Sequence, residues 1–462
     1  MALIKSISGI RGTIGGKVSD NLTPIDTVKF AAAYGMWLKN HTDKEKLTII
    51  LGRDARISGK MVSSLVSNTL VGLGINVVDI GLSTTPTVEV AVTLDHADGG
   101  IIITASHNPK QWNALKLLNG KGEFLNAEDG EEVLSIAEND AYLFSEVDDL
   151  GTYERKKNYI NKHIQEVLNL ELVDIEAIRK AKFKVVVDAV NSTGGIAIPA
   201  LLAKLGVECV ELYCEPNGEF PHNPEPLKEH LTDISELVVK EKADLGIVVD
   251  PDVDRLALVC EDGAMFGEEY TLVACADYVL GKTKGNTVSN LSSSRALRDV
   301  TLKHGGKYQA SAVGEVNVVA LMKSTNAIIG GEGNGGIIYP ESHYGRDSLV
   351  GVALFLSHLA TLKISCKQLR DSYPAYFMSK NKIELTPQIN VDNILSTIAS
   401  NYKNEDVITI DGVKINFETE WVHLRKSNTE PIIRIYTEST SQKNADELAN
   451  RFIKEIESIT IK

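Results

Sequence analysis

The strongest concentration of reactive groups in this sequence is a row of carboxylates, Asp250, Asp252 and Asp254, in the segment DPDVDR (250–255). Carboxylates at alternate positions repel one another, and gathering them is costly unless a cation neutralises them. A hard, oxygen-binding divalent ion is the natural partner, and Mg²⁺ is favoured where a phosphate oxygen completes the coordination. The segment therefore predicts a metal site, with a solvated acidic turn as the plainer alternative.

Two other functions fit the same acidic segment in part. The spacing D-x-D-x-D with Glu261 at the twelfth position is that of a calcium-binding EF-hand loop. Such a loop needs glycine at its sixth position, where this chain has Arg255, and helices on both sides, whereas LGIVV and LALVC are typical of strands. We therefore reject an EF-hand. A phosphatase whose first aspartate after a strand is the nucleophile stays open, although it leaves the next motif unexplained.

A serine with unusual neighbours follows another apolar run, in GIIITASHNP (100–109). Ser106 comes at the end of the predicted strand and is followed by His107, Asn108 and Pro109. A serine there is presented at an exposed turn, and proline stiffens the turn by fixing its own φ. No paired aspartate motif accompanies His107, so we interpret it as a residue that orients the serine turn, and not as the base of a catalytic triad.

A glycine-rich segment, GGEGNGG (330–336), offers Glu332 and Asn334 as an acceptor and a donor. It lacks the Lys-Ser/Thr ending of a nucleotide-binding P-loop, so it suits sugar hydroxyls better than a pyrophosphate. A plain hairpin turn is the alternative.

A basic loop near the end of the chain, RKSNTEPIIR (425–434), has the composition of a phosphate-binding loop. Its candidate ligands are Arg425, Ser427, Asn428, Thr429 and Arg434. Arginine forks, hydroxyls and backbone amides together bind phosphate well. A solvated turn with two incidental arginines is the alternative.

The elements that must position these residues follow a repeated pattern. Short β-branched runs end in polar turns at 46–59, 99–109, 182–195 and 243–255, with amphipathic helical segments such as 58–74 and 198–206 between them. Strands without alternation, separated by helices, predict α/β layers with both sheet faces covered. Ligands gather at the carboxyl ends of strands in such sheets, which is where the polar turns are expected.

Length and composition limit the possible functions. The chain has 462 residues, 43% hydrophobic and 24% charged, and a net charge of −14, which argues against binding to nucleic acid or to an anionic membrane. Five cysteines without C-x-x-C spacing indicate reduced thiols in a cytoplasmic protein, and the N-terminus has no signal-peptide pattern. The apolar segment 349–362 is too short to span a bilayer and predicts a buried core helix. We therefore expect the partner to be a small molecule.

Changes in composition divide the chain into four predicted domains. The first three are α/β units, and the last, with charged helices around short strands, is a smaller α+β unit. The predicted ranges are 1–150 with the serine turn, 151–255 ending in the acidic segment, 256–372 with the glycine-rich segment, and 373–462 with the basic loop.

Four of these motifs, in this order, resemble the signatures of the α-D-phosphohexomutases. They are TASHNP with the following Asn113 and Lys116, then DPDVDR, GGEGNGG and RKSNTEPIIR, and SGIRG (8–12) and LGRDAR (51–56) are similar to that family's first-domain motifs. The resemblance covers nearly the whole chain. It implies an α/β fold of four domains around a central cleft, with three similar α/β domains that contain mixed sheets and a smaller C-terminal α+β domain.

The resemblance also implies a role for the reacting groups. Ser106 would carry a phosphoryl group, and Asp250, Asp252 and Asp254 would hold one Mg²⁺ together with an oxygen of that phosphoserine. The enzyme would interconvert hexose 6-phosphate and hexose 1-phosphate through a hexose 1,6-bisphosphate, which turns end for end in the cleft.

The remaining motif residues would act on the substrate. Arg11 and Arg255 would stabilise the phosphoryl group in transfer, and Lys116 would be the general acid or base. Sugar hydroxyls would be held by Glu332 and Asn334, and the phosphate that is not transferred by Arg425, Ser427, Asn428, Thr429 and Arg434.

Some positions depart from the family pattern. Many members have glycine in place of Ala114, and some have a serine and a histidine where this chain has Asn334 and Gly336. His343, in PESHYGRD, could replace that histidine as a proton relay at the substrate, and an ordinary surface-loop histidine is the alternative.

The sugar and phosphate loops look most like those of phosphoglucosamine mutases. We therefore expect conversion of glucosamine 6-phosphate to glucosamine 1-phosphate, with a phosphoglucomutase/phosphomannomutase as the runner-up. A catalytically silent sugar-phosphate-binding protein is the alternative from another class, but it would need neither Ser106 nor the three aspartates.

Overall fold

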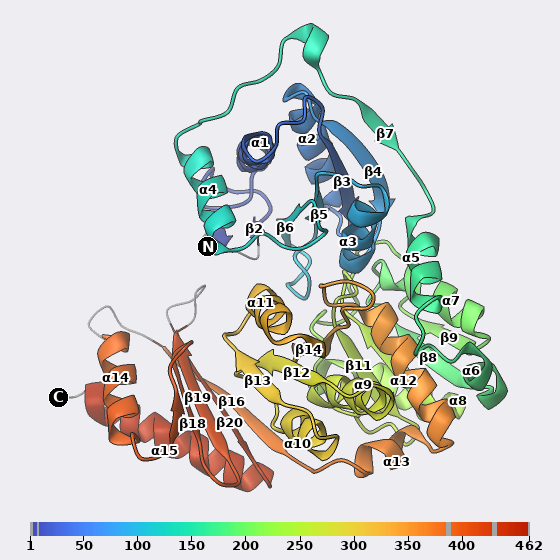
Figure 1. Cartoon of the computed structure of the whole chain (residues 1–462), viewed down its shortest axis with the longest axis vertical. Helices are drawn as coiled ribbons and strands as arrows, with labels where there is room; N and C mark the ends of the chain where they lie inside the picture. Colours follow the sequence, from blue (N-terminus) through green and yellow to red (C-terminus); the bar gives the residue numbers. More distant parts are fainter. Residues whose placement is uncertain (1–2, 7–8, 385–389, 427–431, 461–462) are drawn as a thin grey trace.

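The computed structural model describes residues 3–6, 9–384, 390–426 and 432–460. They form four sheets with their own helices, which we call domains I to IV in chain order. Figure 1 shows domain I at the top, domain II at the lower right, domain III between, and domain IV at the lower left. The predicted α/β fold, with three similar units and a smaller C-terminal unit, is confirmed.

Domain I is built on a seven-stranded mixed sheet. Its strands are β1 (Ile4–Ser6), β2 (Gly9–Thr13), β3 (Thr48–Arg53), β4 (Asn76–Leu82), β5 (Gly99–Ile103), β6 (Trp112–Asn119) and β7 (Tyr153–Arg155). Its helices are α1 (Pro24–Asn40), α2 (Gly59–Gly72), α3 (Thr85–Leu94) and α4 (Ala127–Glu138). The strand order is β1-β2-β6-β5-β3-β4-β7.

Domains II and III each contain a four-stranded sheet. The strands of domain II are β8 (Lys184–Asp188), β9 (Glu208–Leu212), β10 (Leu245–Val249) and β11 (Leu256–Cys260), and its helices are α5 (Tyr159–Leu168), α6 (Ile175–Ala181), α7 (Gly194–Leu205) and α8 (Thr232–Glu241). The strands of domain III are β12 (Asn286–Asn290), β13 (Tyr308–Ser311), β14 (Ala327–Glu332) and β15 (Gly336–Ile338), and its helices are α9 (Glu268–Lys282), α10 (Ala296–Lys303), α11 (Glu315–Thr325), α12 (Ser348–Leu362) and α13 (Cys366–Asp371).

One strand pattern recurs in these three domains. The orders β6-β5-β3-β4, β11-β10-β8-β9 and β15-β14-β12-β13 are the same arrangement, with three parallel strands and an antiparallel fourth. The serine segment joins β5 to β6, the acidic segment joins β10 to β11, and the glycine-rich segment joins β14 to β15. The three motifs therefore occupy the same place in three copies of one unit, at the carboxyl end of the third strand. The sequence predicted such a place for the serine and acidic segments.

Domain IV is a five-stranded antiparallel sheet with two helices. Its elements are β16 (Phe377–Glu384), α14 (Val391–Asn401), β17 (Asp406–Ile408), β18 (Val413–Asn416), β19 (Trp421–Lys426), β20 (Ile432–Ser439) and α15 (Gln442–Thr460). The strand order is β16-β20-β19-β18-β17.

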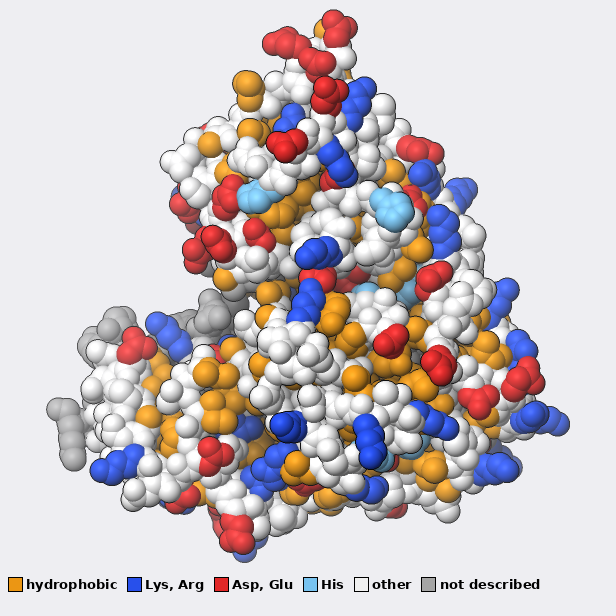
Figure 2. All heavy atoms as spheres, viewed as in Figure 1, with side chains coloured by type: hydrophobic (Ala, Val, Ile, Leu, Met, Phe, Trp, Pro, Cys, Tyr) orange, Lys and Arg blue, Asp and Glu red, His pale blue; other side chains and the backbone are white. Residues whose placement is uncertain are grey.

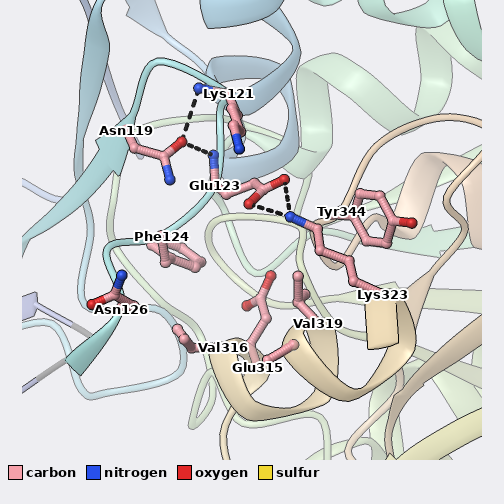
Figure 3. A pocket seen from close by; sticks show the side chains of 11 residues that line it. Asn119, Lys121, Glu123, Phe124, Asn126, Glu315, Val316, Val319, Lys323 and Tyr344 are labelled. Atoms are coloured by element: carbon pink, nitrogen blue, oxygen red, sulfur yellow. Dashed lines mark hydrogen bonds and ion pairs between the residues drawn. The ribbon is translucent and has the colours of Figure 1, made fainter. Parts of the chain in front are cut away.

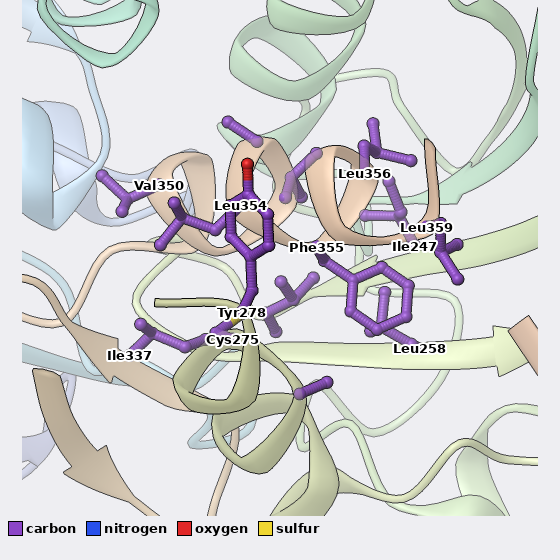
Figure 4. Close-up of a cluster of buried hydrophobic side chains, with 14 of the residues drawn as sticks. Ile247, Leu258, Cys275, Tyr278, Ile337, Val350, Leu354, Phe355, Leu356 and Leu359 are labelled. Carbon is purple, nitrogen blue, oxygen red and sulfur yellow. The ribbon is translucent and has the colours of Figure 1, made fainter. Parts of the chain in front are cut away.

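Domains II and III share one hydrophobic core, whereas domains I and IV have cores of their own. The predicted buried helix is α12, which packs against α9 of domain III and against α5, α6 and α7 of domain II. Figure 4 shows Leu354 and Phe355 of α12 in one cluster with Ile247 and Leu258 of the domain II sheet. The two central domains are thus joined through apolar side chains.

Two helices that border the site begin at side-chain caps. Oγ1 of Thr84 accepts a hydrogen bond from the N–H of Thr87 (3.1 Å) at the start of α3. Oδ1 of Asp347 accepts one from the N–H of Leu349 (2.8 Å) at the start of α12. Such caps satisfy donors that the helix itself leaves unpaired, so they fix where the helix begins.

The helices that the described residues form are all too short or too polar to cross a membrane. The domain boundaries at 150, 255 and 372 stay predictions. β7, at 153–155, completes the first sheet just beyond the first of them.

Candidate active site

Ser106 lies in the loop between β5 and β6 with its hydroxyl against domain II. Its Oγ donates a hydrogen bond to Oδ2 of Asp250 at 2.7 Å, across 144 residues of sequence. The φ of Ser106 is 47°, in the left-handed region, and its N–H donates to Oγ1 of Thr104 (2.9 Å). A residue other than glycine is uncommon there, and such backbone strain is concentrated at functional sites.

Arg56 holds the serine loop in place. Its Nη2 donates to the carbonyls of Ser106 (2.5 Å) and Asn108 (2.6 Å), and its Nη1 to those of Pro109 (2.8 Å) and Trp112 (3.0 Å). Its Nε bonds the buried carboxylate of Asp54 (3.0 Å). The sequence assigned no role to Arg56, although it stands in LGRDAR, because its acceptors are backbone carbonyls that no residue type reveals.

Asp250, Asp252 and Asp254 are all fully buried. Oδ1 of Asp250 accepts the N–H of Asp254 (3.1 Å), and Oδ2 of Asp252 accepts the hydroxyl of Thr85 (2.5 Å). Two further oxygens, Oδ1 of Asp252 and Oδ1 of Asp254, are buried and have no hydrogen-bond partner among the described residues. A buried carboxylate oxygen without a partner is costly, and a bound cation would remove that cost.

Lys116 of β6 contributes one cation to this cluster. Its Nζ lies 2.7 Å from Oδ2 of Asp252 and 3.2 Å from Oδ2 of Asp254. Burial disfavours the ammonium, but Asp252 and Asp254 raise the pKa of Lys116 above its ordinary value, so it is protonated. Burial, then the charges of Asp252 and Asp254, raise the pKa of Asp250 well above its usual range. A further cation beside Asp250 would lower that pKa again and favour the charged carboxylate.

The triad has the properties of a divalent metal site. One oxygen from each aspartate lies within 4.8 Å of the others. The donors are all hard carboxylate oxygens, and two of them are unpaired, which suits Mg²⁺. These three residues could therefore hold the predicted metal ion.

Two arginines and a histidine surround the serine loop. Nη1 of Arg11 donates to Oδ1 of Asn108 (2.9 Å), while Nη1 of Arg255 lies 3.6 Å from Oε1 of Glu225. Nε of Arg255 is buried and has no hydrogen-bond partner in the described part of the chain. Burial, then the charges of Arg255 and Arg11, hold the pKa of His107 well below its usual value, so its imidazole is neutral. Nδ1 of His107 lies 3.4 Å from Oγ of Ser106, and the local charge suits an anion.

The surface-loop interpretation of His343 is wrong, because its side chain is only 10% exposed and lies between two carboxylates. Nδ1 lies 3.2 Å from Oε2 of Glu89 on α3, and Nε2 lies 3.2 Å from Oδ2 of Asp347. Burial disfavours the imidazolium, but Asp347 and Glu89 raise the pKa of His343 to about 10. His343 therefore forms a charged bridge from domain III to domain I, and contact with substrate stays a prediction.

Glu332, the last residue of β14 in domain III, is buried and accepts several hydrogen bonds. Its Oε1 accepts from Nδ2 of Asn290 (2.8 Å) and from the N–H of Gly314 (3.1 Å), and its Oε2 from Nη1 of Arg346 (3.0 Å). Asn334 is half-buried, and its Oδ1 accepts from the N–H of Gly336 (3.3 Å).

Arg346 connects Glu332 to the acidic cluster, because its Nη2 also donates a hydrogen bond to Oδ2 of Asp254 at 2.7 Å. The sequence assigned no role to Arg346 either.

The two described candidate phosphate ligands of the basic loop, Arg425 and Arg434, lie opposite each other in domain IV. Arg425 on β19 pairs in register with Arg434 on β20, and Nε of Arg425 lies 3.3 Å from Oδ2 of Asp411. Like charges directly opposite each other are unfavourable unless an anion joins them. The predicted phosphate ligands Ser427, Asn428 and Thr429 lie outside the described residues.

The surface is notched between domain I and domain IV, as Figure 2 shows. Ser106 and Lys116 of domain I contact the aspartates of domain II directly, and Glu332 of domain III reaches Asp254 through Arg346. Arg425 and Arg434 lie on the fourth domain.

Family models match all four domains of the chain. The descriptions are phosphoglucomutase/phosphomannomutase, alpha/beta/alpha domain I at residues 3–143, domain II at 158–263, domain III at 267–376, and the C-terminal domain at 382–455. The chain belongs to the α-D-phosphohexomutase family. The resemblance inferred from the sequence is thus confirmed, and this phosphohexomutase is an intramolecular phosphotransferase.

Relatives of this phosphohexomutase carry different substrate names. A phosphoglucomutase/phosphomannomutase of Thermococcus kodakarensis is 34% identical over 96% of this chain and 98% of its own. A phosphoglucosamine/phosphogalactosamine mutase of Sulfurisphaera tokodaii is 32% identical over 99% of this chain and 100% of its own.

Solved structures show the same fold. A phosphoglucomutase/phosphomannomutase family protein from Burkholderia thailandensis has a TM-score of 0.84 at 24% identity, over 98% of this chain and 97% of that one. A putative phosphomannomutase from Thermus thermophilus has a TM-score of 0.82 at 23% identity, over the whole of both chains.

Proposed function

We propose that this phosphohexomutase interconverts a hexose 6-phosphate and a hexose 1-phosphate through a phosphoserine at Ser106, with glucosamine phosphate as the preferred sugar. The observation that carries the proposal is the 2.7 Å hydrogen bond between Oγ of Ser106 and Asp250. It brings a serine hydroxyl from domain I onto a buried carboxylate triad of domain II that could hold a metal ion.

Each half of the cycle transfers one phosphoryl group. The bond from phosphorus to Oγ of Ser106 breaks as a bond from phosphorus to a sugar hydroxyl oxygen forms, which gives a hexose 1,6-bisphosphate. The bisphosphate turns end for end, and its other phosphoryl group returns to Ser106. Phosphoryl transfer depends chiefly on positioning and on neutralisation of charge, and Arg255 and a metal ion held by the triad would supply the neutralisation.

Residues of this chain divide the work between them. Arg255, with its unpaired Nε, and Arg11 stabilise the oxygens of the phosphoryl group in transfer. Asp250, Asp252 and Asp254 would hold Mg²⁺, which would supply further neutralisation of phosphate charge. Lys116, protonated between two carboxylates, suits the step that donates a proton. Its pKa falls when those carboxylates are neutralised, which suits the step that accepts one.

The choice of glucosamine rests on the E-x-N-G-G and SNTEP loops and on relatives named for amino sugars. The Sulfurisphaera relative is named for glucosamine and galactosamine phosphates, and a relative from Methanopyrus kandleri, 30% identical over 96% of both chains, is a probable phosphoglucosamine mutase. The Thermococcus relative supports phosphoglucose and phosphomannose as the second candidate.

The phosphoserine is tested by intact-mass measurement after incubation with glucose 1,6-bisphosphate. We expect one added phosphoryl group, which should be absent from Ser106→Ala. The control is Ser64→Ala, since the Ser64 hydroxyl lies on the exposed face of α2, and this variant should still be phosphorylated. An unmodified protein without mutase activity would contradict the proposal and favour a silent sugar-phosphate-binding protein.

Loss of one carboxylate of the triad is the test of its role. We expect Asp252→Asn to lower kcat about 10³-fold, because metal coordination contributes several kcal/mol. Asp244→Asn, at the exposed start of the same strand region, serves as the control and should keep its activity. Full activity of Asp252→Asn would remove the triad from the mechanism.

Coupled kinetics with Mg²⁺ decide the sugar. We expect kcat/KM for glucosamine 6-phosphate to exceed that for glucose and mannose 6-phosphates at least tenfold. Equal values for the three sugars would leave the mutase intact and refute the glucosamine assignment.

A further inference from the structure

One buried side chain, Arg346, between β15 and α12, bonds both the acidic cluster and the glycine-rich segment. Its guanidinium bonds Oδ2 of Asp254 through Nη2 (2.7 Å) and Oε2 of Glu332 through Nη1 (3.0 Å). Nε bonds Oε2 of Glu315 (2.9 Å), and the Arg346 N–H bonds Oε1 of the same carboxylate (3.0 Å). All three carboxylates are buried, so their charges depend on this cation.

The geometry requires arginine. Three carboxylates approach from three directions, and each takes a different nitrogen of one planar group. A lysine ammonium would keep the charge but not this fixed fork.

Glu315 holds the guanidinium from the first turn of α11 and also lines a pocket of about 250 Å³ between α11 and domain I. Figure 3 shows that pocket with an ion pair of Lys323 and Glu123 across it, at 2.6 Å.

The glycine-rich segment leaves room for this side chain. A Cβ at Gly336 would collide with Cδ of Arg346, so any larger residue there would displace the arginine. The segment is also fastened to the end of the acidic segment by the backbone, because the N–H of Leu256 donates to the carbonyl of Gly335 (3.0 Å). A movement of the Asp254 carboxylate would therefore displace the segment 332–336, because Arg346 and the hydrogen bond from Leu256 to Gly335 connect the two directly.

We propose that Arg346 is a positioning residue that couples metal binding at Asp254 to sugar binding at Glu332, and that Gly336 is the glycine that admits it. The inference rests on the proposed function of the two segments. Coupling between two sites is reciprocal, so bound metal raises the affinity for the sugar phosphate by the same factor as the sugar phosphate raises the affinity for the metal.

The test is calorimetric titration of Mg²⁺ into the full-length Ser106→Ala protein, with and without saturating glucosamine 6-phosphate. The Ser106→Ala background prevents turnover, so the readout is binding and not activity. We expect the sugar phosphate to tighten the Kd for Mg²⁺ about fivefold or more, within the usual range of coupling. Arg346→Lys is expected to reduce that factor to about twofold or less.

Gly336→Ala tests the coupling without removing any charge. Like Arg346→Lys, it should make the sugar phosphate tighten the Kd for Mg²⁺ by a smaller factor, because the added methyl group displaces the guanidinium. Arg298→Lys, on an arginine whose side chain is 41% exposed and pairs with its neighbour Asp299, is the matched control and should keep the wild-type factor. If Arg346→Lys does not fold, Gly336→Ala alone decides.

The outcomes separate this inference from the function itself. The inference is overturned if glucosamine 6-phosphate tightens the Kd for Mg²⁺ in Arg346→Lys or Gly336→Ala as much as in the parent protein. It is also overturned if the parent protein shows no coupling. Neither result contradicts the mutase mechanism. Absence of any phosphoryl group on Ser106 in the unsubstituted enzyme would overturn the proposed function instead.

Discussion

The joint between domains II and III and the joint between domains III and IV are built from different interactions. Domains II and III meet in one continuous apolar core, in which α12 packs on helices of both. The third and fourth domains meet through buried polar side chains and backbone carbonyls. Nη1 of Arg295 donates to the carbonyl of Glu418 (3.0 Å), its Nη2 to that of Glu420 (3.0 Å), and Nζ of Lys414 to that of Leu291 (2.7 Å).

This difference has a consequence for the site. Apolar packing is not directional, and a core shared over many side chains separates only when both domains unfold. Hydrogen bonds to carbonyls contribute less each and can be exchanged for bonds to water when the surfaces part. The segments of domains II and III that carry Asp254 and Glu332 are therefore fixed relative to each other, while domain IV is attached so that it can separate without loss of its own core.

The largest loss of stability is expected from Leu354→Ala on α12, in the core that domains II and III share. Removal of a fully buried leucine costs about 3 kcal/mol, and because the core is shared, domains II and III should be destabilised together. Differential scanning calorimetry measures this. The matched change in the domain IV core, Phe452→Ala, should lower a separate transition. Separate transitions for domains II and III, only one of which moved, would refute the shared core.

A smaller effect is expected from Arg295→Met at the other joint. The substitution leaves carbonyls of domain IV without their donor, which costs about 2 kcal/mol for bonds from a charged group. Hydrogen exchange should speed up at the contact of α10 with domain IV, while the amides inside the core of domain IV keep their protection. Arg298→Met, three residues further on and more exposed, should change neither. Unchanged exchange in Arg295→Met would show that the joint does not depend on these bonds.

The smallest effect is a pH dependence from Lys414. Burial, opposed by Glu438, lowers the pKa of Lys414 to about 7. The unfolded chain keeps an ordinary lysine pKa, so between pH 7 and 10 it binds more protons than the folded protein, and stability rises with pH. Lys414→Met should remove up to about 1.4 kcal/mol of that rise per pH unit.

Urea unfolding at pH 7, 8 and 9 measures this difference between the two proteins. Lys443→Met, on a lysine whose side chain is 80% exposed on α15, is the control. A parallel pH profile for the parent protein and Lys414→Met would mean that the buried amine keeps its proton.

The sequence predicted the fold class and the reacting residues because both leave local patterns. β-branched runs that end in polar turns predicted β3, β5, β8 and β10. The carboxylate row predicted a metal site or a solvated turn, and the structure buries it with two oxygens that have no partner among the described residues. Arg56 and Arg346 left no such pattern, since the partners of one are carbonyls and those of the other stand at positions 254, 315 and 332. The partner of His343 on α3, Glu89, left no pattern either, because it stands far from His343 in the sequence.

The sequence by itself determined the α/β fold class and the family, and it predicted which groups would react, because strand runs, turn residues and clustered charge are properties of neighbouring residues. Only the tertiary structure decided that three equivalent turns converge, that Ser106 bonds Asp250, and that one arginine ties the acidic segment to the glycine-rich one. Such contacts depend on how separate sheets pack, and packing is set by the fit of whole surfaces, which no short stretch of sequence contains.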